Sequence, residues 1–334
     1  MPQSLVPHLI TEVPGPKARS IVARSTRAVS PSLPHAYPLA VARAQGVTVE
    51  DVDGNRFLDC AAGIAVCSTG HCHPRVTGAI QRQAGTLLHI CGADFYDPMY
   101  VSLAERLGDL APGDDPKRVF LANSGAEAVE SALKLARHST ERPRIVAFFG
   151  AFHGRTMGAV SLTASKSVYH GGFGPMVPGI AHVPYAYCYR CVYNLTYPDC
   201  GLACVDYIED VLFARSFPAD EVAAIFVEPV QGEGGYIVPP PGWLPALRAL
   251  CDKYGILLIA DEVQCGMGRT GKMFATEHWD VQPDIICLAK ALASGMPLSA
   301  TIARDDIMNW PAGAHGSTFG GNPVCCAAAH ATLD

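Results

Sequence analysis

The stretch from Ile256 to Met296 reads ILLIADEVQCGMGRTGKMFATEHWDVQPDIICLAKALASGM, and it decides the fold. It holds two apolar runs, of which the first stops at Asp261 and the second at Lys290. From about residue 115 onward, similar short runs alternate with helix-length segments, in RVFLANSG, RIVAFFGAFHG, VAAIFVEPVQGEGG and SATIARDD. This alternation is typical of an α/β protein with a mainly parallel central sheet and helices on both faces.

The N-terminal part of the chain differs in composition from the rest. Residues 1 to about 60 are rich in prolines and turn residues, and VTVEDVDGNRFLDC alternates around Asp53 and Gly54, which predicts a hairpin. We therefore expect residues 1–75 to form an N-terminal segment and part of a small domain. Residues 76–334 are expected to form the large domain, with a cysteine-rich excursion at 185–205.

Composition excludes several classes of partner. The 334 residues carry 25 basic and 31 acidic side chains, which gives a formal charge of -6. The chain therefore has no excess of positive charge that would attract nucleic acid or an anionic membrane. No apolar stretch reaches the roughly 18 to 20 residues of a membrane span, and prolines interrupt the N-terminal stretch. The expected partner is a small molecule, and the expected location is the cytoplasm.

The cysteines raise the question of a metal. An odd total of 13 argues against a disulfide framework. In CYRCVYNLTYPDCGLAC, however, Cys188, Cys191, Cys200 and Cys204 have a spacing that could hold zinc or an iron–sulfur cluster. Reduced thiols or a labile disulfide are the alternatives.

Polar and aromatic residues follow the apolar runs, where ligands bind in parallel sheets. They are Ser124, Phe152, His153, Glu228, Asp261 and Lys290. Ser124 opens a helical pattern whose N-terminus would attract a phosphate, although serine is also an ordinary helix N-cap. Phe152, taken alone, fits a core position equally well.

Asp261 and Lys290 give a more specific indication of a binding site than Ser124 and Phe152 do. A carboxylate at the end of an apolar strand is costly unless it meets a cation or hydrogen-bond donors. The two residues could form a salt bridge with each other, or lie as solvated loop charges. Alternatively, a heterocyclic cofactor could lie between them, with a protonated ring nitrogen at Asp261 and an aldehyde carbon at Lys290.

The motif DEVQCGMGRTGKMFATEHWDVQPDIICLAKALASGMPL resembles, over its whole length, the signature of class III aminotransferases. These are pyridoxal 5'-phosphate (PLP) enzymes of fold type I. Supporting matches occur in the family's order, in GIAVCSTGHCHP, NSGAEAVESALKLAR, FHGRT, VEPVQGEGGY and HGSTFGGNP. The resemblance implies a PLP site built from Ser124, Gly125, Ala126, Phe152, His153, Glu228, Asp261, Val263, Gln264, Lys290 and Thr318.

The resemblance also implies roles for these residues. The segment 124–126 would hold the cofactor phosphate, while Phe152 and Val263 would contact opposite faces of the ring. Asp261 would keep the ring nitrogen protonated, and Lys290 would form the Schiff base and then move a proton.

Two further positions would complete the cofactor site. Gln264 would contact the ring hydroxyl. Thr318 would reach the phosphate of a neighbouring subunit, which implies a homodimer with shared active sites.

Among class III enzymes the motifs are most similar to those of 4-aminobutyrate aminotransferases, which pass the amino group to 2-oxoglutarate. Ile64 would then line the substrate pocket, and Glu233 would pair with an arginine that binds the 2-oxoglutarate carboxylate. Three alternatives remain open: an ornithine, lysine or acetylornithine aminotransferase, an amino-acid racemase of the same fold, and a catalytically silent fragment with a four-cysteine module. Because Asp334 lies inside a helical pattern, we expect the C-terminal small domain of the family to be truncated.

Overall fold

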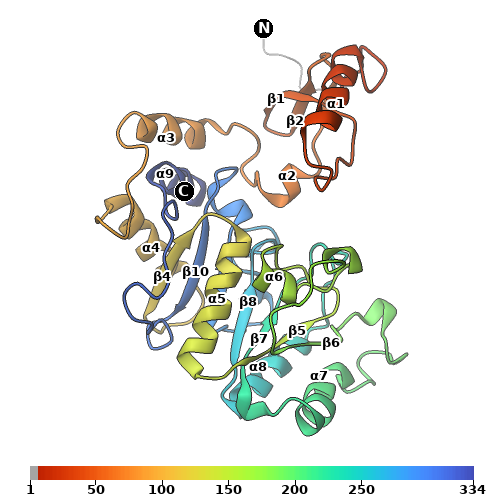
Figure 1. Cartoon of the computed structure of the whole chain (residues 1–334), viewed down its shortest axis with the longest axis vertical. Helices are drawn as coiled ribbons and strands as arrows, with labels where there is room; N and C mark the ends of the chain where they lie inside the picture. Colours follow the sequence, from red (N-terminus) through yellow and green to blue (C-terminus); the bar gives the residue numbers. More distant parts are fainter. Residues whose placement is uncertain (1–6) are drawn as a thin grey trace.

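The computed structural model describes residues 7–334, in which the strands form one three-stranded and one seven-stranded sheet (Figure 1). Residues 1–6, the beginning of the predicted N-terminal segment, lie outside the described residues. The large sheet has the order β4-β10-β9-β8-β7-β5-β6. The strands of this sheet are β4 (Lys117–Ala122), β5 (Arg144–Phe148), β6 (Ile180–Val183), β7 (Val222–Val227), β8 (Leu257–Asp261), β9 (Ile285–Leu288) and β10 (Ser299–Arg304).

The prediction of a mainly parallel α/β sheet is confirmed. Strands β6, β5, β7, β8 and β9 pair in parallel, whereas β10 pairs antiparallel with both β9 and β4. The run SATIARDD, which forms β10, thus departs from the parallel pattern. A parallel return needs a crossover of about a dozen residues or more. The chain between Leu288 and Ser299 is shorter than that, so β10 runs back beside β9.

The edge strand β6 was missed by the sequence pattern. Its residues, IAHV, are few and mostly half-buried. Pro178 lies two positions before them, and Pro184 follows them directly. Such a short edge strand carries almost no periodic signal. It nevertheless extends the sheet by pairing in parallel with β5.

Helices cover both faces of the sheet because its strands are buried on both sides. In β5, Ile145 and Ala147 pack with α5 and α6, whereas Val146 and Phe148 pack with α8 on the opposite face. At the β4–β10 end, α4 and α9 cover that second face. The α-helices are α1 (Pro16–Ala28), α2 (Ala62–Ala65), α3 (Pro74–Ala84), α4 (Pro98–Leu110), α5 (Gly125–Thr140), α6 (Met157–Leu162), α7 (Ala203–Tyr207), α8 (Trp243–Tyr254) and α9 (Pro323–Leu333). Shorter helical turns are η1 (Ser167–Tyr169), η2 (Cys188–Arg190), η3 (Ile208–Phe213, a π-helix), η4 (Ala219–Glu221), η5 (Ala275–His278) and η6 (Lys290–Ala293).

The N-terminal unit is built around the predicted hairpin, which is confirmed. Strands β1 (Val41–Gln45), β2 (Thr48–Asp51) and β3 (Arg56–Leu58) form an antiparallel sheet. The carboxylate of Asp53, in the turn of the hairpin, accepts hydrogen bonds from the backbone N–H groups of Lys17 and Ala18 (2.9 and 2.8 Å). It thereby satisfies the free donors at the start of α1. Figure 1 shows this unit projecting from the body of the molecule.

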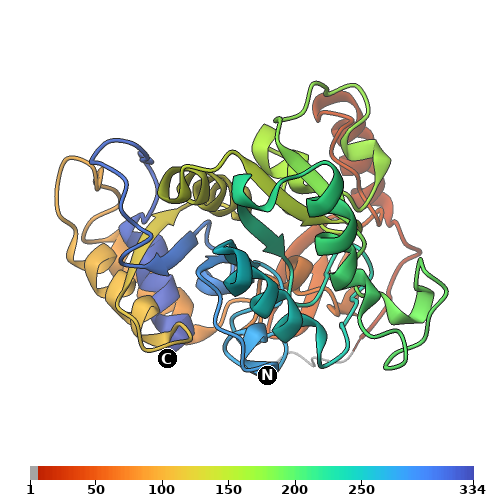
Figure 2. The same cartoon turned by 90° about the horizontal axis from the view of Figure 1, so that it is seen from below.

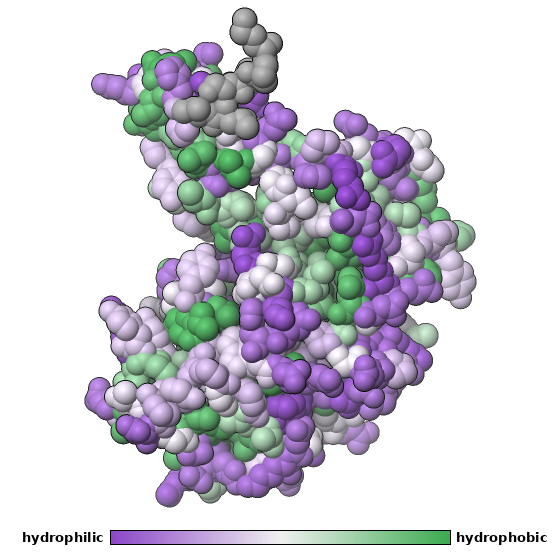
Figure 3. Space-filling model, turned by 180° about the vertical axis from the view of Figure 1, so that it is seen from behind, coloured by the Kyte–Doolittle hydropathy of each residue, from purple (hydrophilic) through white to green (hydrophobic). Residues whose placement is uncertain are grey.

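The surface of the molecule mixes polar and apolar residues. On the face shown in Figure 3, hydrophilic and hydrophobic residues are interspersed, and a notch separates the N-terminal unit from the body. Among residues 7–334, no helix has the length and apolar content needed to cross a bilayer.

Candidate functional site

A cavity of about 360 Å³ lies at the carboxyl edge of the parallel strands. It brings together most of the predicted site residues, which come from five separate segments of the chain. The predicted residues that line it are Ser124, Gly125, Ala126, Phe152, His153, Glu228, Glu233, Asp261, Val263, Gln264 and Lys290. The volume falls in the range of small-molecule sites, roughly 300–1,000 Å³.

The carboxylate of Asp261, at the end of β8, pairs with a histidine. Its Oδ2 lies 2.7 Å from Nδ1 of His153, and its Oδ1 accepts a hydrogen bond from the backbone N–H of Val263 (3.0 Å). Both side chains are buried. Burial lowers the pKa of His153, but the hydrogen bond to Asp261 and the charges of Asp261 and Glu228 outweigh burial, so its pKa is raised. The cation that Asp261 requires at the strand end is therefore His153.

Lys290 lies across the same cavity, at the first position of η6. Its backbone has φ = 30°, a left-handed conformation that costs energy for a residue with a side chain. Burial lowers the pKa of its amine, although the charge of Asp261 acts in the opposite direction. The ion-pair partner of Asp261 is His153, so the structure does not favour the alternative of an Asp261–Lys290 salt bridge.

Glu228, the residue after β7, is a second buried carboxylate. It accepts hydrogen bonds from the backbone N–H groups of Phe152 (2.9 Å) and Gly232 (3.0 Å). Burial raises its pKa to about 7, with an opposing effect from His153 and a reinforcing one from Asp261. Glu228 thus holds the segment that carries Phe152 and His153 against the end of β7.

The start of α5 forms another wall of the cavity. Ser124 caps this helix: its hydroxyl accepts a hydrogen bond from the backbone N–H of Glu127 (3.3 Å) and donates one to the Glu127 carboxylate (3.0 Å). The ordinary N-cap interpretation is therefore correct for the side chain, while the helix terminus still presents its positive end to the cavity.

Two glycines keep the backbone close-packed beside this terminus. A Cβ atom at Gly125 would lie 2.8 Å from Val263, and one at Gly154 would lie 2.8 Å from the Cβ of Ala126. Gly154 also has φ = +134°, which residues with side chains rarely adopt.

The rim of the cavity contains residues that sequence reasoning missed. The ring of Tyr169 packs edge-on against Phe152 at 5.5 Å, and the guanidinium of Arg155 lies 4.5 Å from the Tyr169 ring centroid. Arg155 belongs to the FHGRT motif, so its position next to Phe152 offered a signal. Tyr169 is brought here by tertiary structure alone.

Glu233 is paired at this rim, but not with an arginine. One carboxylate oxygen accepts hydrogen bonds from the amine of Lys166 and from the hydroxyl of Tyr169 (2.9 Å). The predicted arginine partner of Glu233 is not tested by these contacts and stays a prediction.

Two predicted residues lie away from the cavity. Thr318 is exposed on the loop between β10 and α9, and Ile64 is exposed by 68% on α2, while Val66 lines the cavity instead. Their predicted roles stay predictions.

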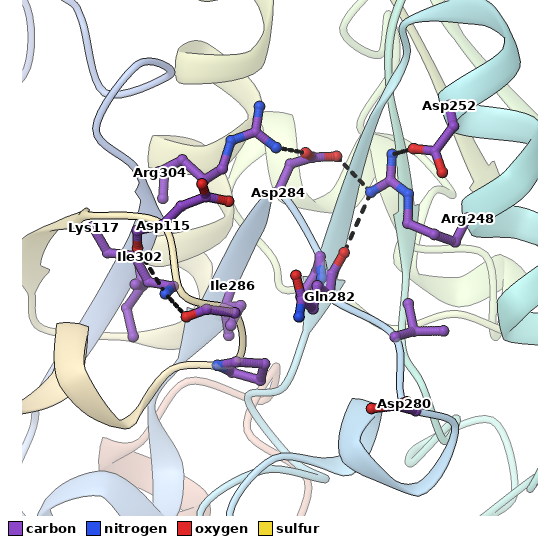
Figure 4. Close-up of a pocket in the computed structure, with 15 residues that line it drawn as sticks. Asp115, Lys117, Arg248, Asp252, Asp280, Gln282, Asp284, Ile286, Ile302 and Arg304 are labelled. Atoms are coloured by element: carbon purple, nitrogen blue, oxygen red, sulfur yellow. Dashed lines mark hydrogen bonds and ion pairs between the residues drawn. The ribbon is translucent and has the colours of Figure 1, made fainter.

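A second cavity, of about 350 Å³, lies at the opposite edge of the sheet (Figure 4). Its charged groups are largely paired with one another: Asp284 binds Arg248 (2.7 Å) and Arg304, and Arg248 also binds Asp252 (2.8 Å). This network ties α8 to the neighbouring ends of β9 and β10, which is a structural role.

The four cysteines of the excursion line a small cavity of about 20 Å³, in a segment that projects from the body (Figure 2). Burial raises the pKa of Cys204 to about 11 and also raises that of Cys188. Throughout residues 7–334, no group of three or more His, Cys, Asp or Glu side chains is arranged to hold a metal ion. All four thiols are free, as the alternative of reduced thiols requires, and the metal-bound alternative is left to a measurement of metal content.

Comparison with known proteins identifies the family. Residues 30–334 match the family described as Aminotransferase class-III. The 4-aminobutyrate aminotransferase of Mycobacterium tuberculosis is 46% identical over 331 residues, which cover 97% of this chain and 73% of that protein.

Solved structures agree. The (S)-enantioselective omega-transaminase of Thermomicrobium roseum is 36% identical with a TM-score of 0.87, covering 95% of this chain and 74% of that one. A PLP-bound amine transaminase from an uncultivated Pseudomonas species is 35% identical with a TM-score of 0.84, covering 92% and 72%. The chain belongs to the class III aminotransferase family.

Proposed function

We propose that this protein transfers the amino group of 4-aminobutyrate, or of a similar ω-amino acid, to 2-oxoglutarate by a ping-pong mechanism. The observation that carries the proposal is the cavity in which the paired carboxylate of Asp261 and the amine of Lys290 lie at different walls. The 46% identity to a 4-aminobutyrate aminotransferase supports this choice of donor.

The residues of the cavity fit PLP, the cofactor that the family implies. The carbonyl oxygen of the Gln264 side chain is buried without a hydrogen-bond partner among the described residues, as expected of an acceptor for the ring hydroxyl. The α5 terminus offers a positive end to a phosphate, and Gly125 and Gly154 leave the space that larger residues would fill. Phe152 and Val263 provide surfaces for the two faces of a ring.

When bound, PLP supplies an aldehyde carbon and an electron-withdrawing ring. Asp261 would then hold the proton on the ring nitrogen, and His153, whose Nδ1 lies 2.7 Å from Oδ2 of Asp261, would orient the carboxylate. Lys290 would hold the cofactor at its aldehyde carbon, and its amine would serve as the base for the proton on the donor carbon that carries the amino group. Its lowered pKa favours the neutral amine that this step needs.

The rim residues position the substrate. The guanidinium of Arg155, held over the rings of Tyr169 and Phe152, is placed to bind the substrate carboxylate that lies away from the reacting amine. A homodimer belongs to the same proposal, because the exposed Thr318 loop is free to reach the phosphate of a neighbouring subunit.

The test is a visible absorption spectrum of the PLP-loaded protein before and after addition of 4-aminobutyrate without any oxo acid. We expect the band of lysine-bound cofactor to convert to that of pyridoxamine phosphate. A band that forms but never converts would contradict this donor. In a separate assay with a chiral α-amino acid, loss of its optical rotation without conversion of the band would indicate racemisation.

The control is Lys290→Ala. We expect this variant to lose the band that borohydride reduces. A reducible band that persists would exclude Lys290 as the residue that binds the aldehyde.

A further inference from the structure

A short strap, residues 66–71, connects the N-terminal unit to the turn that carries Lys290. The strap follows α2, which lies between the N-terminal unit and the large sheet (Figure 1). At one end of the strap, His71 exchanges two backbone hydrogen bonds with Gly46, in the turn between β1 and β2 (both 2.8 Å). At the other end, Val66 lines the cavity. The strap thus leads from the small sheet to the proposed cofactor site.

Between these ends the strap is hydrogen-bonded to residues 290–294, the Lys290 turn. The Ser68 hydroxyl donates to the backbone carbonyl of Ala291 (3.3 Å). The backbone N–H of Thr69 donates to the Ser294 hydroxyl oxygen (3.3 Å), and the hydroxyl oxygens of Thr69 and Ser294 lie 2.6 Å apart. These contacts join residues 223 or 225 positions apart in the sequence, so only the folded chain brings them together.

The backbone of the Lys290 turn is strained at both ends. Lys290 has φ = 30° and Ser294 has φ = 45°, in the left-handed region that residues with a side chain seldom adopt. Such a conformation persists only where the surrounding structure holds it. The turn itself is a single turn of 3-10 helix, whose hydrogen bonds have poorer geometry than those of an α-helix. Contacts from other parts of the chain are therefore needed to hold it.

We propose that Thr69 and Ser294 are positioning residues, whose paired hydroxyl groups tie the strap to the Lys290 turn and keep the Lys290 amine at the cavity. The inference rests on the proposed function, because the position of the amine matters through the aldehyde that it binds. Val66, three residues before Thr69, lines the same cavity as Lys290. The strap and the turn are therefore adjoining parts of one wall.

The opposing interpretation is that apolar packing alone holds the turn. Its three middle residues, 291–293, are buried in the core. Their packing fixes the middle of the turn, whereas the strained backbone lies at its two ends, at Lys290 and Ser294. Removing only the hydroxyl contact leaves the apolar side chains unchanged, so the two interpretations predict different results for the Lys290 amine.

The first measurement is the pKa of the Lys290 amine in the cofactor-free protein, by isotope-labelled reductive methylation of the lysines and NMR titration. The Lys290 signal is identified by its absence from Lys290→Ala. In the unaltered protein, burial lowers this pKa against the opposing charges of Asp261, Glu228 and Cys265. Release of the turn would let the amine reach water and raise its pKa toward the value of a solvated lysine, about 10.4.

Two variants remove the hydroxyl contact. We expect Ser294→Ala to raise the pKa of Lys290 and to raise the Kd of PLP about fivefold, the usual worth of one hydrogen bond. The Kd is measured from the band that borohydride reduces. Thr69→Val keeps the backbone N–H that donates to Ser294, so its effects should have the same direction and be smaller.

Two further variants are controls. Thr69→Ser keeps a hydroxyl group at this position and should restore both values to those of the unaltered protein. Thr77→Val is the matched control, because the Thr77 hydroxyl donates to the carbonyls of His73 and Pro74 (3.1 and 3.3 Å), at the start of its own helix α3. Thr77→Val should change neither the pKa of Lys290 nor the Kd of PLP.

Two outcomes would overturn the proposal. One is a Lys290 pKa in Ser294→Ala equal to that in Thr77→Val. The other is a Ser294→Ala variant that unfolds at a lower urea concentration but binds PLP as tightly as Thr77→Val does, which would show a purely structural contact. Because the amine is titrated without cofactor or donor, failure of the proposed function would appear separately, as an unaltered protein whose PLP band never converts with 4-aminobutyrate.

Discussion

Replacing His153 with phenylalanine should destabilise the protein in a way that depends on pH. The substitution keeps a ring against Phe226, which lies 5.7 Å from the His153 ring, but removes the cation 2.7 Å from Asp261. Removing one partner of a buried ion pair costs about 3–5 kcal/mol. His153 Nε2 is buried without a hydrogen-bond partner among the described residues, and losing that group returns roughly 1–3 kcal/mol. We therefore expect a net loss of about 2 kcal/mol in the free energy of unfolding.

The direction of the pH dependence follows from the raised pKa of His153. A group whose pKa is higher in the folded state stabilises that state fully below its unfolded pKa, about 6.5 for histidine. The contribution is lost as pH rises through the folded pKa. The deficit of His153→Phe should thus be largest at pH 6 and below and become smaller at higher pH.

The assay is urea unfolding of the cofactor-free protein between pH 5.5 and 9, with the unaltered protein and His153→Phe compared at each pH. The double variant His153→Phe/Asp261→Asn is the control, because it removes the unpaired buried charge as well and should be more stable than His153→Phe alone. Because His153 and Asp261 both influence the pKa of Glu228, all three proteins carry Glu228→Gln, which removes its titration from the comparison. A His153→Phe deficit that grows with pH, or a double variant less stable than the single one, would refute the reasoning.

Two further predictions concern backbone space and the cysteines. Gly154→Ala should weaken PLP binding, measured by fluorescence titration, because the new Cβ would lie 2.8 Å from Ala126 and the backbone has φ = +134°. Gly172→Ala is the control, because Gly172 also has a positive φ (+82°) but nothing lies within 4 Å of its Cβ position. Equal effects of the two substitutions would contradict a role of packing. We also expect elemental analysis to find no stoichiometric zinc or iron, because no group of three or more His, Cys, Asp or Glu side chains among the described residues is arranged to hold a metal ion. One metal ion per chain, lost on Cys188→Ser/Cys191→Ser, would instead establish the metal site.

The sequence alone predicted the main sheet because its signal is local. Apolar runs such as ILLIA and IICLA are short, β-branched or aliphatic, and bounded by polar residues, and such runs identify buried strands without knowledge of their neighbours. The carboxyl ends of parallel strands share one edge, so the meeting of Asp261 and Lys290 in one cavity also followed from the pattern. The hairpin around Asp53 depended on turn residues next to each other in the chain, and it too was predicted.

The partners of these residues were decided by tertiary structure. That Asp261 pairs with His153, 108 residues earlier in the chain, depends on the parallel order that places β8 two strands from β5. The reversed direction of β10 depends on the length of its connection to β9, not on its own residues.

The rim of the cavity shows most clearly which contacts the sequence predicts and which ones only the tertiary structure decides. Sequence reasoning selected Glu233 from its motif, but the lysine and tyrosine that hold it lie in a stretch with no periodicity and no motif. Local patterns record which side chains need burial or a turn, because those needs are met by near neighbours. Which charges meet across a cavity is set by how separate segments pack in space, and only the folded chain determines that.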